Sequence, residues 1–325
     1  MMRYLPICLL LIPLVSTSSF AVKALRLDYS QAMDTVSVKD GVMSMTGDLT
    51  FFYTPRMMMM YMKNQKFGKM PGDAKMSDKD REQTKQLMNR PRSMRTVINL
   101  DSPEDFTVTT ISMDPKKPDV TKTMCSVVKV NSKLEEKARE NMSGWTYEVK
   151  ETGTKKEIAK LASEEFIVSV SDNSKGTKID ATDFFHFSSI GKVLLDFHEN
   201  SEKSRPSQYG ATHMPKVPDA LMKRAKDGVI FTSMDTLVQD PKKPENKSKI
   251  KMVLTHWAWQ EMDARYFQKP KCDFTFSSDT LDSLGLSKPK FDLGETLKKS
   301  MPSSDDVLKK AMPKPKLPGV LKGIF

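Results

Sequence analysis

The chain has 325 residues, with 52 Lys and Arg against 41 Asp and Glu, so its formal net charge is +11. Hydrophobic residues make up 38% and charged residues 29%, which is ordinary for a folded protein and leaves room for one large domain or two modest ones. With only 3 Cys and 14 Gly, the composition excludes a disulfide-stapled miniprotein and a collagen-like chain.

Residues 1–21 have the pattern of a secretory signal peptide. Arg3 provides the positive start, residues 4–15 form a short apolar segment, and Ser19 and Ala21 are the small residues that precede a cleavage site. The apolar segment is much shorter than the roughly 20 residues that a membrane-spanning helix needs. We therefore expect cleavage after Ala21 and a soluble mature protein that is periplasmic or secreted.

Residues 22–285 are expected to form one β domain, because apolar side chains alternate along short segments separated by polar turns. A hairpin is predicted around the turn at 39–41, where Asp-Gly tolerates positive backbone dihedrals. The pentapeptide Asp-Pro-Lys-Lys-Pro occurs at 114–118 and at 240–244, each time between two strand patterns, which indicates two turns of similar chemistry rather than a duplicated domain. Strands are predicted at 94–100, 106–113, 121–130, 145–150, 165–170, 177–187, 228–238 and 250–259.

Few helices are predicted. Ser132 and Glu135 form a capping box that opens a helix ending near Met142. Short amphipathic helices at 188–198 and 218–226 are expected to pack across the sheet. Residues 70–92 are polar and charged with almost no apolar stripe, which indicates an exposed helix or an insertion.

Residues 51–62 carry the most unusual composition, a run of five methionines and one tyrosine at 57–62. On a strand, the side chains of this run alternate between two faces: Met58, Met60 and Met62 on one, and Met57, Met59 and Tyr61 on the other. Flexible thioethers pack against irregular apolar shapes, as a lipid cavity requires. Clustered methionines also bind Cu(I), but a strand separates neighbouring thioethers and no His or Cys lies nearby in sequence, so packing is the favoured interpretation.

The two indoles of Trp257 and Trp259 lie at positions i and i+2 and therefore share one face of a strand. Core packing is the simpler interpretation, and the apolar wall of a ligand space is the functional one. The candidate ligand-binding residues are Phe52, Met58, Met60, Met62, Trp257 and Trp259.

No motif in the sequence identifies a reaction. The four histidines are too far apart for a compact metal site, and we find no nucleophile elbow, Walker loop or dinucleotide fingerprint. We therefore expect no enzyme activity, no cofactor and no metal. In an oxidising compartment Cys125 and Cys272 permit one disulfide, but the sequence does not decide whether it forms.

The final segment, 286–325, is basic and rich in proline, with 9 Lys against 4 Asp and Glu. Its prolines exclude one long helix. Nucleic acid is a poor candidate partner, because the aromatic residues are not interleaved with the lysines. The tail is expected either to dock on an anionic membrane or a partner, or to remain solvated. The docking residues would be Lys309, Lys310, Lys314, Lys316 and Phe325.

From about Val42 to Phe276, the order of features resembles periplasmic proteins of unknown function with a predicted LolA-like lipoprotein-carrier fold. The best-matching part is 125–170, in which a strand, the capped helix, residues 151–159 and a second strand follow one another. Residues 228–230 and 263–270 resemble later parts of the family pattern. The resemblance implies a mainly β fold, a curved antiparallel half-barrel sheet with short helices across its concave face. The insertion at 70–92, the region 187–228 and the tail have no counterpart.

The leading functional expectation is an exported binding protein that holds a lipid-like ligand or a lipoprotein acyl chain in an apolar cavity. The alternative is a structural or interaction protein of the envelope that docks through the basic tail.

Overall fold

The computed structural model describes residues 21–37, 41–68, 77, 82, 86, 89–90, 92–114, 117–129, 145–172, 177–204, 219–240 and 243–277. These residues form a mainly β fold built on one 12-stranded sheet with the order β12-β6-β5-β4-β3-β2-β1-β11-β10-β9-β8-β7. β12 runs parallel to β6, and every other pair is antiparallel. The sheet is open, with β12 and β7 at its two edges. The expectation of a mainly β, largely antiparallel sheet is confirmed.

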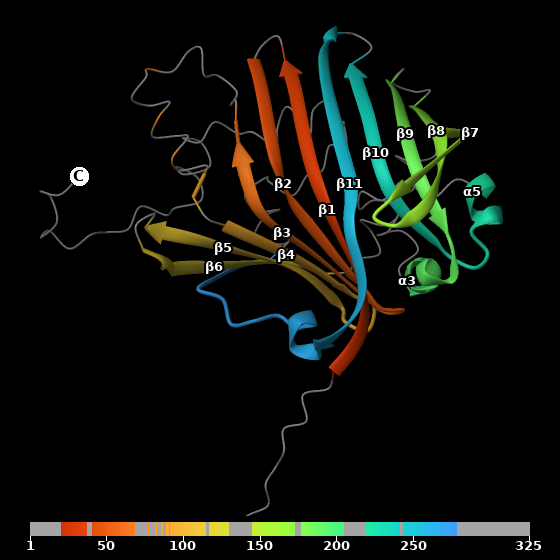
Figure 1. Cartoon of the computed structure of the whole chain (residues 1–325). Coiled ribbons are helices and arrows are strands. Elements are labelled where there is room, and N and C mark those ends of the chain that lie inside the picture. The colour runs from red at the N-terminus through yellow and green to blue at the C-terminus, as the bar shows by residue number, and fades with distance from the viewer. Residues whose placement is uncertain are drawn as a thin grey trace, which may run out of the picture.

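The strands are long and follow one another mostly as hairpins (Figure 1). Their bounds are β1 (Ala21–Ser37), β2 (Gly41–Tyr53), β3 (Met57–Phe67), β4 (Arg92–Asn99), β5 (Glu104–Asp114), β6 (Lys117–Lys129), β7 (Trp145–Ile158), β8 (Leu161–Asp172), β9 (Thr177–Phe187), β10 (Val229–Asp240), β11 (Lys243–Asp263) and β12 (Phe274–Ser277).

The predicted turns lie where strands reverse. Ser37 pairs with Gly41 at the β1–β2 hairpin. Each copy of the repeated pentapeptide begins at the last residue of one strand and ends within the next, in the β5–β6 and β10–β11 hairpins. Asp114 pairs with Lys117 in the first hairpin, and Asp240 pairs with Lys243 in the second. The interpretation of both pentapeptides as hairpin turns is therefore confirmed.

The sheet curls strongly at its β7 end. In sheet order three strands separate β7 from β11, which on a flat sheet would place them about 19 Å apart. The two strands nevertheless contact each other. Ile158 and Leu161, at the β7–β8 turn, belong to the same buried cluster as Leu25 of β1. The sheet therefore bends toward the face that carries this cluster.

One helix, α3 (Lys192–Ser204), packs on that face, preceded by the short 3-10 helix η2 (Ser189–Gly191). Phe197 and Val193 of α3 join the cluster of Leu25, and Asn200 Nδ2 donates a hydrogen bond of 2.8 Å to Pro55 O in the β2–β3 connection. A short helix, α5 (Asp219–Arg224), lies nearby at the β8–β9 side. Helices are thus confirmed in both regions, 188–198 and 218–226, although the first continues to Ser204. The helix predicted at 132–142 lies outside the described residues.

The two faces of the sheet carry different cores. We call the first the helix face. It carries two clusters: one contains Leu27 of β1 and residues of α3, and the other contains Phe166 of β8 and residues of both α3 and α5. On the second, which we call the strap face, Phe52, Met59 and Val97 form a third cluster. Because side chains alternate along a strand, neighbouring residues of β3 contribute to opposite cores, as the sequence predicts for the methionine run.

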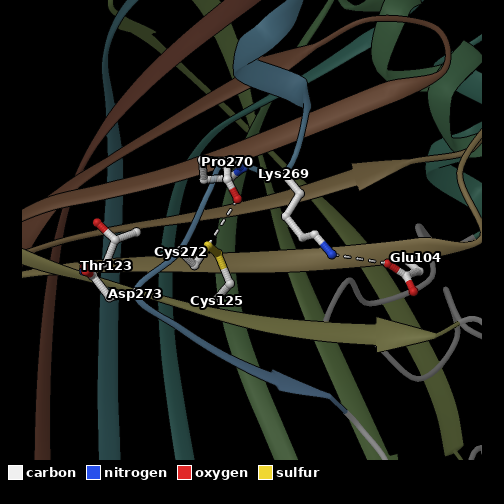
Figure 2. The surroundings of a disulfide bond; sticks show 7 residues. All are labelled: Glu104, Thr123, Cys125, Lys269, Pro270, Cys272 and Asp273. Atoms are coloured by element: carbon white, nitrogen blue, oxygen red, sulfur yellow. Dashed lines mark hydrogen bonds and ion pairs between the residues drawn. A yellow bond between two sulfur atoms is a disulfide. The ribbon is translucent and has the colours of Figure 1, made fainter.

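Residues 264–273, which we call the strap, cross the second face from the end of β11 to β6. They begin with the 3-10 helix η3 (Ala264–Phe267), whose Phe267 is buried in the strap-face core. A disulfide then joins Cys272 to Cys125 of β6, with the two Cα atoms 5.9 Å apart (Figure 2). Next to it, Thr123 N donates to Asp273 Oδ2 at 2.8 Å and Asp273 N donates to Thr123 O at 2.9 Å. These contacts place β12 beside β6.

Replacing Gly228 by Ala is expected to lower the free energy of unfolding by about 2 kcal/mol. Gly228 has φ +132, and a Cβ there would collide with Ser188 O and with the first turn of α3. Urea denaturation measures the change. Gly153→Ala is the matched control, because Gly153 also has a positive φ, +81, but no atom lies within 4 Å of its added Cβ. Equal losses in both variants would contradict a close packing role for Gly228.

Candidate binding face

A continuous row of aromatic rings crosses the helix face. It runs from α3 through β2, β1, β10, β9 and β8, with successive ring centroids between 5.6 and 6.4 Å apart. Its members are Phe197, Tyr53, Phe51, Tyr29, Phe231, Phe185, Phe166 and Phe187. Edge-to-face pairs predominate, the geometry that aromatic rings prefer.

This aromatic row is a satisfied core rather than an open surface. The hydroxyl of Tyr29 donates to Phe231 O at 2.7 Å, and burial raises the pKa of Tyr29 well above its ordinary value, so the phenol stays a neutral donor. At the β8 end, the guanidinium of Arg224 lies over the rings of Phe166 and Phe187, 5.6 and 4.9 Å from their centroids. The β8 end of the row is thereby covered by a protein group.

Arg224 is held in place by two carboxylates. Its Nη1 donates to Glu151 Oε1 at 2.7 Å and its Nη2 donates to Glu164 Oε2 at 2.6 Å. The three residues come from α5, β7 and β8, so the ion pairs fasten the short helix α5 to the curled edge of the sheet. All three side chains are partly solvent-exposed, and we assign them a positioning role for the helix rather than a chemical one.

Beside the aromatic row lies a second group on the helix face, which we call the methionine band. It consists of Met33, Met45, Met62, Met234 and Met252, one each from β1, β2, β3, β10 and β11. Met234 pairs with Met252 and Met33 with Met45. Gln31 connects these pairs to β3, because it lies opposite Met252 and its Nε2 donates to Met62 Sδ at 3.9 Å. Every one of them is only partly buried, unlike the leucines of the adjoining core. The band therefore presents flexible apolar side chains over five neighbouring strands.

The structure separates the six candidate ligand-binding residues. Met58 is buried in the helix-face core, and Met60, Met62 and Trp257 pack against it. Phe52 pairs with Met59 and lies in the strap-face core, so it does not join the others.

Trp259 belongs to neither core. It pairs with Leu25, two positions along the strand from the Trp257–Leu27 pair. Its indole is 42% exposed, with Lys23 Nζ 5.3 Å from the ring centroid. The two indoles thus differ: Trp257 packs against the core, and Trp259 forms the exposed end of the same strand face.

Four of the five methionines in the band were not among the sequence candidates. Met33, Met45, Met234 and Met252 lie on separate strands, and each alone has the pattern of an ordinary core residue. The one signal in the sequence was the high total of 24 Met, which does not indicate where the thioethers meet.

Two buried polar side chains lie on this apolar face. Asp183 of β9 pairs in register with Phe166 of β8 and Met234 of β10, and it is 8% exposed. Thr236 of β10 is 7% exposed. In the described part of the chain neither Asp183 Oδ1 nor Thr236 Oγ1 has a hydrogen-bond partner. Burial raises the pKa of Asp183 to about 7.

The described residues contain no group of three or more His, Cys, Asp and Glu side chains suited to a metal ion. The thioethers of 57–62 divide between the two faces, which disfavours a copper site made from this run alone. No helix in the ranges described is long and apolar enough to cross a membrane. The signal segment, most of the insertion at 70–92 and the basic tail with Lys309, Lys310, Lys314, Lys316 and Phe325 lie outside the described residues.

Comparison with known proteins leaves the geometry as the main guide to function. The chain matches no protein-family model and no curated protein.

Proposed function

We propose that this protein is an exported, non-enzymatic binding protein that holds an acyl chain against its helix face. The observation that carries the proposal is the methionine band, five partly exposed thioethers on five adjacent strands. Spanning four strand spacings, the band is about 19 Å wide. Each methylene that it shelters from water contributes about 0.8 kcal/mol.

The LolA-like half-barrel is part of this proposal. The open sheet, its curl at the β7 end and the packing of α3 on the inward-bending face are consistent with that architecture. In this arrangement the aromatic row is the rigid floor that supports α3, and the methionine band is the adaptable part. Long unbranched side chains adjust to ligands of different shape, which suits an acyl chain with few polar groups.

Export rests on two observations. The first is the signal pattern of residues 1–21, and the second is the Cys125–Cys272 disulfide, a bond that persists in oxidising compartments such as the periplasm and the cell exterior. Detection of a mature chain that begins at Val22, by mass spectrometry of protein secreted or exported from its host, tests this part directly.

Binding is tested with the double variant Met234→Gln and Met252→Gln. These residues pair across β10 and β11 and are partly exposed, so glutamine is accommodated while the apolar contact is lost. We expect the affinity for 1-dodecylpyrene, measured by fluorescence titration, to fall about tenfold, which corresponds to about 1.4 kcal/mol of lost apolar contact.

The matched control is Leu237→Gln. Leu237 lies on β10 next to Thr236 but points to the other face of the sheet, where it is 44% exposed. This variant is expected to bind the probe as the parent protein does. A parent protein that is free of lipid in native mass spectrometry and does not bind the pyrene probe would refute the proposed function.

A further inference from the structure

The helix face carries one polar feature that a purely apolar ligand leaves unexplained. Asp183 and Thr236 are both more than nine-tenths buried, and each has a polar atom without a hydrogen-bond partner among the described residues. A buried polar group that lacks a partner destabilises the folded state, so native proteins seldom retain one without a reason. Two such groups on the same face indicate a site whose partner is a ligand.

Register places the two groups next to each other and next to the methionine band. Asp183 pairs with Met234, and Thr236 lies two residues further along β10, opposite Ala181. Diagonal neighbours of this kind lie about 7 Å apart on one face of an antiparallel sheet. Met234 in turn pairs with Met252, so the polar groups stand at one end of the band. An acyl chain on the band would bring its terminal polar group to Asp183 and Thr236.

Among the residues that the structure describes, no charged group neutralises Asp183. From β8 it is faced by Phe166, and the nearby Glu164 is engaged with Arg224 of α5. From β10 it is faced by Met234 and Thr236, and α3 contributes Leu195 to the same apolar cluster. The carboxyl therefore has an apolar environment, and a ligand lying over it removes still more water. Both conditions favour the uncharged acid, which has one proton to donate.

We propose that Asp183 and Thr236 are the polar anchor of the acyl ligand and recognise an uncharged hydrogen-bond acceptor, the carbonyl of an ester. The Asp183 carboxyl and the Thr236 hydroxyl each donate a hydrogen bond to an ester oxygen placed between them. This inference rests on the proposed function, because it assigns the head group of the ligand whose chain lies on the methionine band. The ligand class is an acyl ester rather than a free fatty acid or an amine.

The proposal predicts that ester binding strengthens as the pH falls. With the pKa of Asp183 at about 7, the protonated fraction in the free protein rises about tenfold between pH 8 and pH 6. The probe is the methyl ester of 12-(1-pyrenyl)dodecanoic acid, titrated by fluorescence. We expect it to bind about tenfold more tightly at pH 6 than at pH 8. The hydrocarbon 1-dodecylpyrene, which has no acceptor, is expected to bind equally at both pH values.

Two variants assign the pH dependence to the anchor. Asp183→Asn keeps a donor at every pH, so it is expected to bind the ester at both pH values with about the parent affinity at pH 6. Thr236→Val removes a hydroxyl and is expected to weaken ester binding about fivefold at both pH values without changing hydrocarbon binding. The matched control is Asp180→Asn on the same strand, where Asp180 accepts a hydrogen bond from Ser169 Oγ at 2.7 Å. This control is expected to retain the tenfold dependence.

The outcomes separate the two proposals. Binding of both probes without any pH dependence, or a pH dependence that persists in Asp183→Asn, overturns the anchor and leaves the apolar binding face intact. Tighter binding of 12-(1-pyrenyl)dodecylamine at pH 8 than of the ester at pH 6 also overturns it, in favour of a cationic head group. Binding of neither the ester nor the hydrocarbon overturns the proposed function, and the anchor with it.

Discussion

Reducing the Cys125–Cys272 disulfide is expected to lower the free energy of unfolding by about 5 kcal/mol. The bond spans a sequence separation of 147, and the chain-entropy model for a loop of that size gives about 5 kcal/mol at room temperature, because the unfolded chain gains the freedom that the cross-link removed. Urea denaturation of the protein with and without dithiothreitol measures the difference as a shift in the midpoint.

The control for this prediction is the double variant Cys125→Ala and Cys272→Ala. Dithiothreitol should leave its urea midpoint unchanged, since no disulfide is present to reduce. Hydrogen exchange supplies a local readout, because Thr123 N donates to Asp273 Oδ2 at 2.8 Å and should lose protection when the strap detaches. An unaltered midpoint and an unaltered Thr123 amide after complete reduction would show that the strap is held by its other contacts.

The stability of the protein is expected to fall by about 4 kcal/mol as the pH rises from 4 to 8, through the ionisation of Asp183. Burial raises the pKa of this carboxyl from 3.8 in an unfolded chain to about 7 in the folded protein. Between those values the folded state binds more protons than the unfolded state, so stability is greatest below the lower pKa, declines as the pH rises to the higher one and then levels off. The difference between 3.8 and about 7 corresponds to about 4 kcal/mol.

Asp183→Asn removes this titration. At pH 8 the variant is expected to be more stable than the parent protein by about 4 kcal/mol, and at pH 4 the two should be similar. Urea denaturation across this pH range, repeated for Asp180→Asn as the surface control on the same strand, measures the effect. If the free energy of unfolding depended on pH in the same way for the parent protein and for Asp183→Asn, the prediction would be wrong. That result would mean that ionisation of the carboxyl does not destabilise the folded protein, as expected if water reached it.

Much of the local structure was predictable from short stretches of sequence. The repeated pentapeptide forms two hairpin turns, because Asp followed by Pro favours a tight reversal wherever two strands flank it. The strand at 177–187 has the predicted bounds, and the alternation of Met58 and Met59 between two faces follows from the pleat alone. These features depend on neighbours a few residues away.

The start of β1, whose end is the first arm of the predicted hairpin, and the whole of β12 escaped prediction for different reasons. β1 begins at Ala21, the last residue of the predicted signal segment, so no turn signal marked where it starts. β12 has only 4 residues and pairs in parallel with β6, held there by the strap. So short an apolar stretch is not distinguishable from a loop without its partner.

The sequence by itself determined that this chain is a β protein with hairpin turns, two short helices and a methionine-rich strand, because turn chemistry and period-two alternation act over a few residues. Only the tertiary structure decided that β1 lies between β2 and β11, which brings Met33, Met45 and Met252 onto one face. It also decided that Phe52 faces away from Met58 and that Asp183 is buried among apolar side chains. Strand order and register are set by the packing of residues far apart in the chain, and no local pattern encodes them.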